Sequence, residues 1–551
     1  MSELVLGPLL RYVGEHEATV WVEADSASEV EVLGHRTRTF EVEGHHYALV
    51  RVEGLEAGTA TPYEVRLDGE HRWPPPNWPH PPSVIRTIDR SGTYRLLFGS
   101  CRAARPHEPP YTLPRDQSEH AREFDALYAY ALRMRTEPRE RWPDLLLWLG
   151  DQVYADDVSL GTRHFIASRR DPREPPGFEV ADFEEYTHLY LDAWSDPLIR
   201  WLLSTVSSAM IFDDHDVHDD WNISQAWVDQ MRALPWWHER IAGGLMSYWV
   251  YQHLGNLSPR ELAEDATLRR IEAGEPAGPL VRALAERADR DPAAARWSFV
   301  RDLGGSRLVA IDSRAGRVLA PERRMLDAHD WEYVERGARG DCDHVLLATS
   351  VPWLLADGMH NLEQWNERVC DGAWGETAAR LGERVRQGLD LEHWAAFDRS
   401  FRDLGELARA VATGERGAPP ASVVALSGDV HHAYLYEVGF RRRADRARPR
   451  VPVYQAVCSP VRNALSRRER RVIRMGQTRG FAAVTRALAR AAGARDQNLR
   501  WRPPDGEGPW FSNQLGTLEL DGRRAVMRLE QPIPAVAGPP RLERLFERRL
   551  S

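Results

Sequence analysis

The feature that most constrains the fold is a short apolar run that turns abruptly polar and recurs along the chain. Runs of this length are typical of strands buried on both faces, as in a parallel sheet covered by helices. A helical pattern, "EHAREFDALYAYALRMR", lies between the first two runs. The order strand, helix, strand predicts an α/β fold (α+β overall). The runs are "YRLLFGSC", "DLLLWLGD", "SAMIFDD", "SRLVAIDSR", "HVLLATSVPW" and "SVVALSGDVHH".

The first ninety residues show a different pattern. Segments such as "ATVWVEA" and "YALVRVEGLEAGTATPYEVRLDGE" alternate apolar and polar residues around turns, which predicts a small β-sandwich of immunoglobulin or fibronectin type. The segment "HRWPPPNWPHPPS" then supplies six prolines, which cannot continue a ladder. We therefore expect a domain boundary between residues 73 and 90, with a sandwich at 1–88 and the larger α/β domain at 89–551.

The larger domain contains three segments that interrupt the α/β pattern. Residues near 160–205 and 255–297 read as helical insertions. Residues near 465–500 are rich in arginine and partly amphipathic around "GFAAVTRALARAAG". A solvated surface helix explains this last segment; a lid that attracts phosphate, or a partner surface, is the alternative.

Composition excludes several classes of protein. The formal net charge is −10, which disfavours a general nucleic-acid binder. The sequence lacks a run of about eighteen apolar residues, so we expect no membrane span. We find no secretory or twin-arginine signal and expect a cytoplasmic protein. Four scattered cysteines do not suggest a disulfide framework. The oligomeric state is left open.

The polar residues that follow the apolar runs are candidate ligands for a bound group. In an open α/β sheet, ligands bind in the crevice outside the carboxyl ends of the strands. Independent strands would therefore deliver these side chains to one edge. They are Cys101; Asp151 and Tyr154; Asp213, Asp214 and His215; Asp312; Ser350; and Asp429, His431 and His432.

The densest of these segments is "DDHDVHDD", with five aspartates and two histidines between Asp213 and Asp220. Carboxylates crowded at a buried strand end repel one another, and cations remove that penalty. Asp214, Asp151, Tyr154, Asp429 and His431 are therefore candidate metal ligands. A solvated loop explains Asp219 and Asp220 nearly as well as a ligand role does, and Asp219 is kept as a candidate.

Cys101 is either a small buried core residue or a thiolate ligand. Because the other strand ends also carry candidate ligands, we favour the ligand role. Thiolate and imidazole suit transition metals, whereas carboxylates suit Ca²⁺, Mg²⁺ or Mn²⁺. The mixed ligand set predicts more than one ion. Such a site chiefly supports hydrolysis of small-molecule phosphate esters. His215 is then the candidate acid, and Arg102 and Arg314 are candidate phosphate clamps.

Two other function classes compete with this hypothesis. A catalytically silent metal-binding or interaction protein would bind the ions without turnover. A hydrolase with a serine nucleophile is disfavoured, because the sequence has no Gly-x-Ser-x-Gly elbow and Ser100 and Ser350 lack an obvious partner.

The motifs "GSC", "GDQVYAD", "FDDHD" and "SGDVHH", in this order, resemble the alkaline phosphatase D (PhoD-like) family of calcineurin-like metallophosphoesterases. The resemblance implies a β-sandwich before a four-layered αββα domain, with phosphomonoesterase or phosphodiesterase activity. It implies a ferric iron on Cys101, Asp151, Tyr154 and His431. It also implies calcium on Asp214 and Asp429, with Asp151 as the bridge; Mn, Mg or Zn are alternatives. Asp219 and Asp220 stand where some members have Asn, so the number or identity of the hard ions is open.

Overall fold

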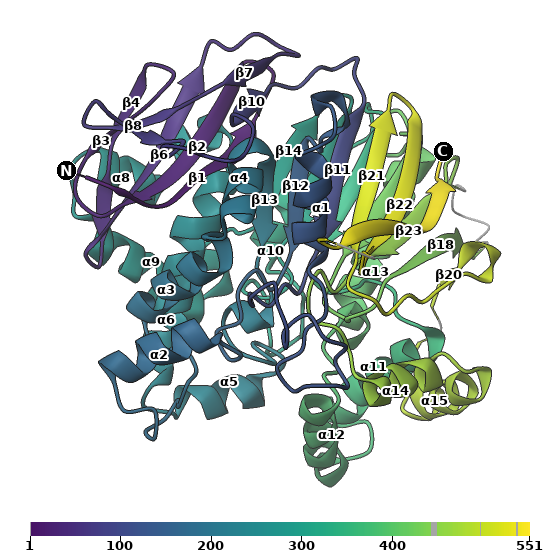
Figure 1. The fold of residues 1–551 in the computed structure, drawn as a ribbon. Coiled ribbons are helices and arrows are strands. Elements are labelled where there is room, and N and C mark those ends of the chain that lie inside the picture. Colours follow the sequence, from purple (N-terminus) through teal and green to yellow (C-terminus); the bar gives the residue numbers. More distant parts are fainter. Residues whose placement is uncertain (1, 442–448, 496, 536–537) are drawn as a thin grey trace.

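The N-terminal part of the chain is built from β-strands (Figure 1). The computed structural model describes residues 2–441, 449–495, 497–535 and 538–551. One four-stranded sheet has the order β1-β2-β6-β5 and another the order β4-β3-β8-β9, while β10 pairs with β7. The strands are β1 (Leu4–Val13), β2 (Glu17–Ala24), β3 (Glu29–Val32), β4 (His35–Arg38), β5 (Phe40–Val42), β6 (His45–Glu53), β7 (Ala60–Pro62), β8 (Val65–Leu67), β9 (Glu70–Trp73) and β10 (Val84–Arg86).

Two larger sheets form the rest of the fold. The first has the order β13-β12-β11-β21-β22-β23, in which β11, β12 and β13 are parallel. A C-terminal antiparallel hairpin, β21 and β22, extends it beside β11. Its strands are β11 (Tyr94–Gly99), β12 (Leu145–Leu149), β13 (Ser207–Ile211), β21 (Leu515–Asp521), β22 (Arg524–Ile533) and β23 (Arg541–Arg549).

The second sheet has the order β14-β15-β16-β17-β19-β18-β20. Strands β15, β16, β17 and β19 are parallel, and the antiparallel strands lie at the two edges. The expected α/β fold is confirmed: the parallel strands lie on one side of the first sheet and in the centre of the second. The strands are β14 (Phe299–Leu303), β15 (Ser306–Ile311), β16 (His344–Thr349), β17 (Ser422–Ser427), β18 (Tyr434–Phe440), β19 (Val453–Val457) and β20 (Leu499–Arg502).

Alternate residues of the second sheet belong to different cores. Leu346 and Ala348 of β16 join the core that contains Leu97 and Leu518 of the first sheet. Val345 and Leu347, on the opposite face of β16, join the core beneath the helices. This period of two is expected for a strand buried on both faces. The two sheets therefore pack against each other as inner layers, as expected for an αββα arrangement.

Helices form the outer layers and the insertions. Helix α1 contacts β22 and β23 of the first sheet, and α10 and α13 contact β15 and β17 of the second. The helices are α1 (Ala126–Met134), α2 (Leu160–Arg169), α3 (Phe183–Trp194), α4 (Pro197–Thr205), α5 (Gln225–Arg232), α6 (Trp237–Ser247), α7 (Pro259–Glu264), α8 (Ala266–Glu272), α9 (Ala277–Arg290), α10 (Ala328–Gly337), α11 (Asp357–Cys370), α12 (Glu376–Gly388), α13 (Asp398–Thr413), α14 (Arg467–Gly476) and α15 (Arg479–Ala491).

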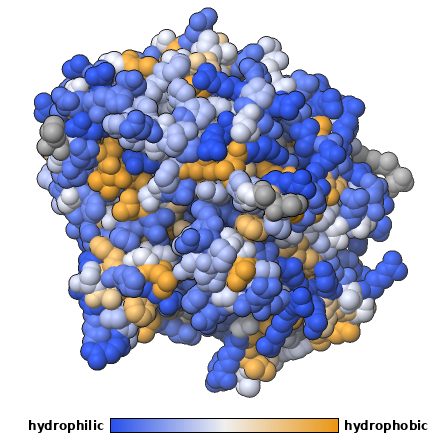
Figure 2. All heavy atoms as spheres, viewed as in Figure 1, coloured by the Kyte–Doolittle hydropathy of each residue, from blue (hydrophilic) through white to orange (hydrophobic). Residues whose placement is uncertain are grey.

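The exterior is mostly polar on the face shown in Figure 2, where apolar residues form small separate groups. In the part of the chain that the structure describes, every helix is too short or too polar to cross a membrane.

An ionic contact joins the N-terminal strands to helix α3. The Nδ1 atom of His45 on β6 lies 2.9 Å from Glu23, and its Nε2 atom lies 2.8 Å from Glu184 on α3. Burial alone would lower the pKa of His45, but the hydrogen bonds to Glu23 and Glu184 outweigh burial and raise it to about 9. The imidazolium is therefore part of the contact at neutral pH.

We expect His45→Gln to lower the free energy of unfolding by about 1 kcal/mol near pH 6.5, a figure reduced for solvent screening. Because the folded pKa is raised, this stabilisation is fully present below about pH 6.5 and is lost as the pH rises through about 9. Urea unfolding of both proteins at several pH values measures the difference. The neighbouring His46, which has no ion pair among the described residues, supplies the control His46→Gln. A difference between wild type and His45→Gln that stays constant to pH 10 would contradict this assignment.

Candidate metal centre and active site

The carboxyl ends of strands from both large sheets meet at one place. Cys101 follows β11 of the first sheet, and Asp429 follows β17 of the second. The backbone N–H of Asp429 donates to Ser100 Oγ at 2.9 Å, and Cys101 Sγ lies 3.5 Å from the carbonyl oxygen of Asp429. The strand ends that the sequence singled out are therefore neighbours in space, although they lie more than three hundred residues apart.

Four of these strand-end residues adopt left-handed backbone conformations. The φ angles are 56° at Cys101, 52° at Asp151, 66° at Asp429 and 51° at His431. A non-glycine residue in this region costs of order 1 kcal/mol, and such residues cluster at functional sites. The backbone therefore turns sharply after each strand at the positions where candidate ligands stand.

Carboxylates converge at this crevice in two overlapping groups. Ligand atoms of Asp151, Asp214 and His215 all lie within 4.8 Å of one another, as do those of Asp213, Asp214 and Asp429. Burial raises the pKa of Asp151 and of Asp213 well above the ordinary value; neighbouring carboxylates add to the rise, while His215 beside Asp151 and Arg314 beside Asp213 oppose it. The crowding that the sequence suggested is real, and charged carboxylates here need cationic partners.

The donor set fits bound metal ions. Asp151 Oδ1 and Asp213 Oδ2 are buried and have no hydrogen-bond partner among the described residues. Asp214 Oδ1 also accepts no hydrogen bond there, although it forms an ion pair with Arg314 Nη2 at 3.3 Å. Unpaired buried oxygens are costly, and metal coordination satisfies them. Oxygen ligands of this kind suit hard cations.

Asp216 has a structural role in the same loop. Its Oδ2 atom accepts hydrogen bonds from the backbone N–H groups of Asp151 (3.0 Å) and Asp213 (2.9 Å). One buried carboxylate therefore ties the loop after β12 to the loop after β13. Asp216 therefore orients the candidate ligands Asp151 and Asp213 through their backbone N–H groups.

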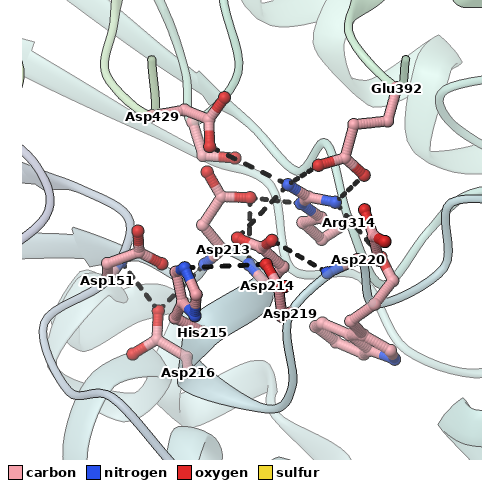
Figure 3. Close-up of polar contacts among 12 residues, drawn as sticks. Asp151, Asp213, Asp214, His215, Asp216, Asp219, Asp220, Arg314, Glu392 and Asp429 are labelled. Carbon is pink, nitrogen blue, oxygen red and sulfur yellow. Dashed lines mark hydrogen bonds and ion pairs between the residues drawn. The ribbon is translucent and has the colours of Figure 1, made fainter. Parts of the chain in front are cut away.

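Arg314 supplies positive charge to the second group of carboxylates (Figure 3). The guanidinium is fully buried and bonds to Asp213 and to Glu392, whose Oε1 atom lies 2.7 Å from Nη2. Nη2 also lies 3.3 Å from Asp214 and 4.0 Å from Asp429. Arg314 therefore neutralises part of the acidic charge; its expected contact with phosphate stays a prediction.

Asp429 is held by a second pair of groups. His393 Nε2 lies 2.9 Å from Asp429 Oδ2, and His393 Nδ1 lies 2.6 Å from Glu363 of α11. Burial opposes protonation, but Glu363 and Asp429 raise the pKa of His393 well above the ordinary value. This chain fixes one oxygen of Asp429, and the other faces the candidate metal site beside Arg314.

Cys101, Tyr154 and His431 border the acidic groups, and neither group includes Cys101 or His431. The Ser459 hydroxyl donates to Cys101 Sγ at 3.1 Å, and Asn463 donates to the Tyr154 hydroxyl at 3.2 Å. Burial raises the pKa of both Cys101 and Tyr154 well above the ordinary values. Their ionised forms would therefore need a nearby cation.

The two histidines after β17 have different surroundings. Burial, then the charge of His215, lowers the pKa of His431 to about 4, and neither ring nitrogen has a hydrogen bond among the described residues. The neutral imidazole of His431 can therefore offer a lone pair. His432 instead donates from Nδ1 to the Val430 carbonyl at 2.7 Å and stacks on Phe511.

His215 lies at the edge of the first group with its ring held in place. Nδ1 lies 2.9 Å from Asp156 Oδ2, and the ring centroid lies 4.7 Å from that of Tyr154. Nε2, on the far side of the ring, is 3.8 Å from Asp219, whose side chain is 64% exposed. Asp219 lies outside both groups, so its role as a ligand stays a prediction.

Arg102 points into a different environment. Its guanidinium is buried, with Nε 2.9 Å from Asp125 and Nη1 donating to the Ala193 carbonyl at 3.0 Å. These contacts tie the loop after β11 to helices α1 and α3. The structure gives Arg102 partners away from the carboxylate groups, and its contact with phosphate stays a prediction.

Several residues of the site were missed from the sequence. Glu392 and His393 come from "DLEHW", which follows no apolar strand and so gave no signal. Asp156 is the last residue of the motif "GDQVYAD", and a carboxylate five residues after the strand-end Asp could have been weighed as a partner for a histidine. Asn463 follows β19 and carried no recognisable pattern.

Two packed mixed sheets, with carboxylate and imidazole side chains at their strand ends, define a protein of metallophosphoesterase-like fold. A family model described as PhoD-like phosphatase matches residues 123–509, and a domain of unknown function, DUF7800, matches residues 1–85. The chain belongs to the PhoD-like phosphatase family.

Similarity to solved structures extends over nearly the whole chain. A structure of PhoD is similar over 99% of this chain and 92% of its own, with a TM-score of 0.57 and 11% sequence identity. The purple acid phosphatase PPD1 from seeds of yellow lupin (Lupinus luteus) has a TM-score of 0.46 and 12% identity, covering 95% of this chain and 71% of its own. No curated protein matches the sequence.

Proposed function

We propose that this protein hydrolyses small-molecule phosphate esters with metal ions held at the strand-end crevice. The observation that carries the proposal is the convergence of buried carboxylates with orphaned oxygens, in a chain of the PhoD-like phosphatase family. When bound, such ions neutralise phosphate oxygens and activate a water molecule for in-line attack.

The ligand set supports two kinds of ion. Cys101, Asp151, Tyr154 and His431 would hold a transition metal, because thiolate, phenolate and imidazole favour such an ion. Ferric iron is the ion that the family resemblance implies for this position. Asp214 and Asp429 would hold calcium, with Asp151 between the two positions, because hard cations prefer carboxylate oxygens. The hydroxyl of Ser459 supports the thiolate at 3.1 Å. Manganese, magnesium or zinc are alternatives that elemental analysis distinguishes.

The chain's own residues supply proton transfer and orientation. Asp156 holds Nδ1 of His215, which leaves Nε2 to protonate the departing oxygen of the ester. Arg314, locked by Asp213 and Glu392, keeps positive charge beside Asp214. Glu363 and His393 fix the orientation of Asp429.

A panel of aryl and alkyl phosphate mono- and diesters tests this function. We expect turnover by the purified protein, loss of turnover on chelation, and recovery when metal is restored. Persistent inactivity of the metal-loaded protein against the whole panel would favour a silent metal-binding protein instead. The double variant Asp151→Ala, His431→Ala is the matched negative control. Wild-type turnover in that variant would show that the measured activity does not arise at this site.

A further inference from the structure

A pocket apart from the candidate metal centre lies between helix α11, helix α15 and strand β20. Its volume is about 400 Å³, within the range of small-molecule sites. Among the residues that the structure describes, five arginines line it, Arg441, Arg486, Arg490, Arg495 and Arg500, together with one carboxylate, Asp357. The pocket therefore combines the size of a ligand site with a strong excess of positive charge.

Three of the five arginines have no neutralising carboxylate among the residues that the structure describes. Arg486 lies 3.3 Å from Asp357. Among the described residues, Arg441, Arg495 and Arg500 form no side-chain ion pair or hydrogen bond. Guanidinium groups gathered around one cavity repel one another, and a bound anion removes that repulsion. Arginine also presents a planar set of donors that matches phosphate oxygens.

The floor of the pocket contains a buried histidine without polar partners. His360 is 1% exposed, and neither of its ring nitrogens has a hydrogen-bond partner among the described residues. Its ring lies between Phe401 and Trp501, each with its centroid 4.8 Å away. Burial, with Arg402 nearby, lowers the pKa of His360 to about 3, so the ring is neutral and offers one donor and one acceptor. An unsatisfied buried polar group of this kind is costly, and a polar ligand would satisfy it.

Helix α11 contributes different side chains to this pocket and to the surroundings of the metal centre. His360, Asn361 and Gln364 of α11 line the pocket. Glu363, in contrast, is directed to His393. The arginine-lined pocket therefore has its own set of side chains.

We propose that the arginine-lined pocket binds a small phosphate-bearing anion. Arg441, Arg495 and Arg500 would hold the phosphate oxygens, and Trp501 would contact the organic part of the ligand. This inference does not depend on the proposed hydrolysis, because none of the lining residues belongs to the candidate metal centre. It gives the arginine-rich segment near 465–500, which contains α14 and α15, a phosphate-attracting role.

Equilibrium binding of two ligands to the metal-loaded protein tests the proposal. Phenylphosphonate has an organic part and cannot be cleaved by phosphoester hydrolysis. Inorganic phosphate has no organic part. We expect a binding site in wild type that weakens about 100-fold in the double variant Arg441→Gln, Arg500→Gln, since two charge-assisted contacts are lost. Hydrolytic activity should be retained. The control Arg173→Gln, Arg260→Gln removes the same charge from side chains that are 88% and 87% exposed. Equal affinity and stoichiometry in both double variants would overturn the proposal.

Hydrogen–deuterium exchange of wild type provides a measurement that no variant can confound. Phenylphosphonate should slow exchange in peptides spanning residues 357–364 and 497–501. Protection confined to residues 150–156, 213–220 and 429–431 would place all binding at the metal centre and would also overturn the proposal. Tighter binding of phenylphosphonate than of inorganic phosphate would identify a ligand with an organic part, and equal affinities would identify phosphate alone as the recognised group.

Discussion

Asp151→Asn is expected to lower kcat/KM for a bis-aryl phosphate by about 10³-fold or more and to lower the bound metal content. Asp151 stands in the first carboxylate group, where its Oδ1 atom is buried and unpartnered. Several kcal/mol of transition-state stabilisation come from metal ions in such sites, and each 1.36 kcal/mol corresponds to a factor of ten. Steady-state kinetics together with elemental analysis of the variant measure both effects.

The same substitution has an opposite effect on the metal-free protein. Burial and the charges of Asp214 and Asp213 disfavour the Asp151 carboxylate when no cation is present. A neutral amide removes that cost, so we expect the melting temperature of the metal-free variant to exceed that of metal-free wild type.

Asp157→Asn is the matched control for Asp151→Asn. Asp157 belongs to the same loop, but its carboxylate contacts Arg105 at 2.9 Å and Arg122 at 2.8 Å. This variant should keep its metal and most of its activity. Full activity and full metal content in Asp151→Asn would remove Asp151 from the metal centre.

His215→Gln is expected to lower kcat by about 10² to 10⁴-fold for an ester with an alkyl leaving group. The reason is that an alkoxide needs a proton as it departs, and Asp156 holds Nδ1 of His215, which leaves Nε2 to donate that proton. A 4-nitrophenolate leaves without that help, so the defect should be much smaller for 4-nitrophenyl esters. Comparing kcat for the two leaving groups at constant metal content measures the effect.

His218→Gln is the control for His215→Gln. His218 lies three residues away, and its Nδ1 atom donates to the Asp219 carbonyl at 2.8 Å. Asp156→Asn should reproduce part of the His215 defect, because it frees the ring without removing it. A His215 defect of equal size for both leaving groups would rule out proton donation and indicate a positioning role.

The strand-end residues of the centre could be predicted because local sequence determines them. Each apolar run forms a buried strand, and the residue that follows it must emerge at the carboxyl edge of the sheet. Asp151, Asp214 and Asp429 were therefore predicted as ligands from their positions alone. The structure brings ligand atoms of Asp214 within 4.8 Å of those of Asp151 in one group and of Asp429 in the other, and their binding of metal stays a prediction. The strand pattern also predicted that Cys101 and Asp429 would lie together, but at the edge of one sheet. Their strands belong to two packed sheets, an arrangement that depends on tertiary packing and that only the family resemblance implied.

Residues that act from loops and helices could not be predicted in this way. His393 reaches Asp429 from a segment before α13, and Glu363 reaches His393 from α11. No local pattern connects these positions: His393 and Asp429 are 36 residues apart, and Glu363 and His393 are 30 residues apart. The arginine-rich segment was visible as a composition bias, but its pocket arises only where α15 packs on α11.

Elemental analysis of the protein purified without added metal, read beside its visible absorbance and its activity, tests the central claim most directly. We expect iron together with a hard cation, a tyrosinate charge-transfer band that disappears in Tyr154→Phe, and turnover of an aryl phosphate in the same sample. A colourless protein that contains only zinc and is fully active would contradict the iron assignment. A protein that binds no metal and still hydrolyses phosphate esters at the wild-type rate would contradict the account of the site as a whole.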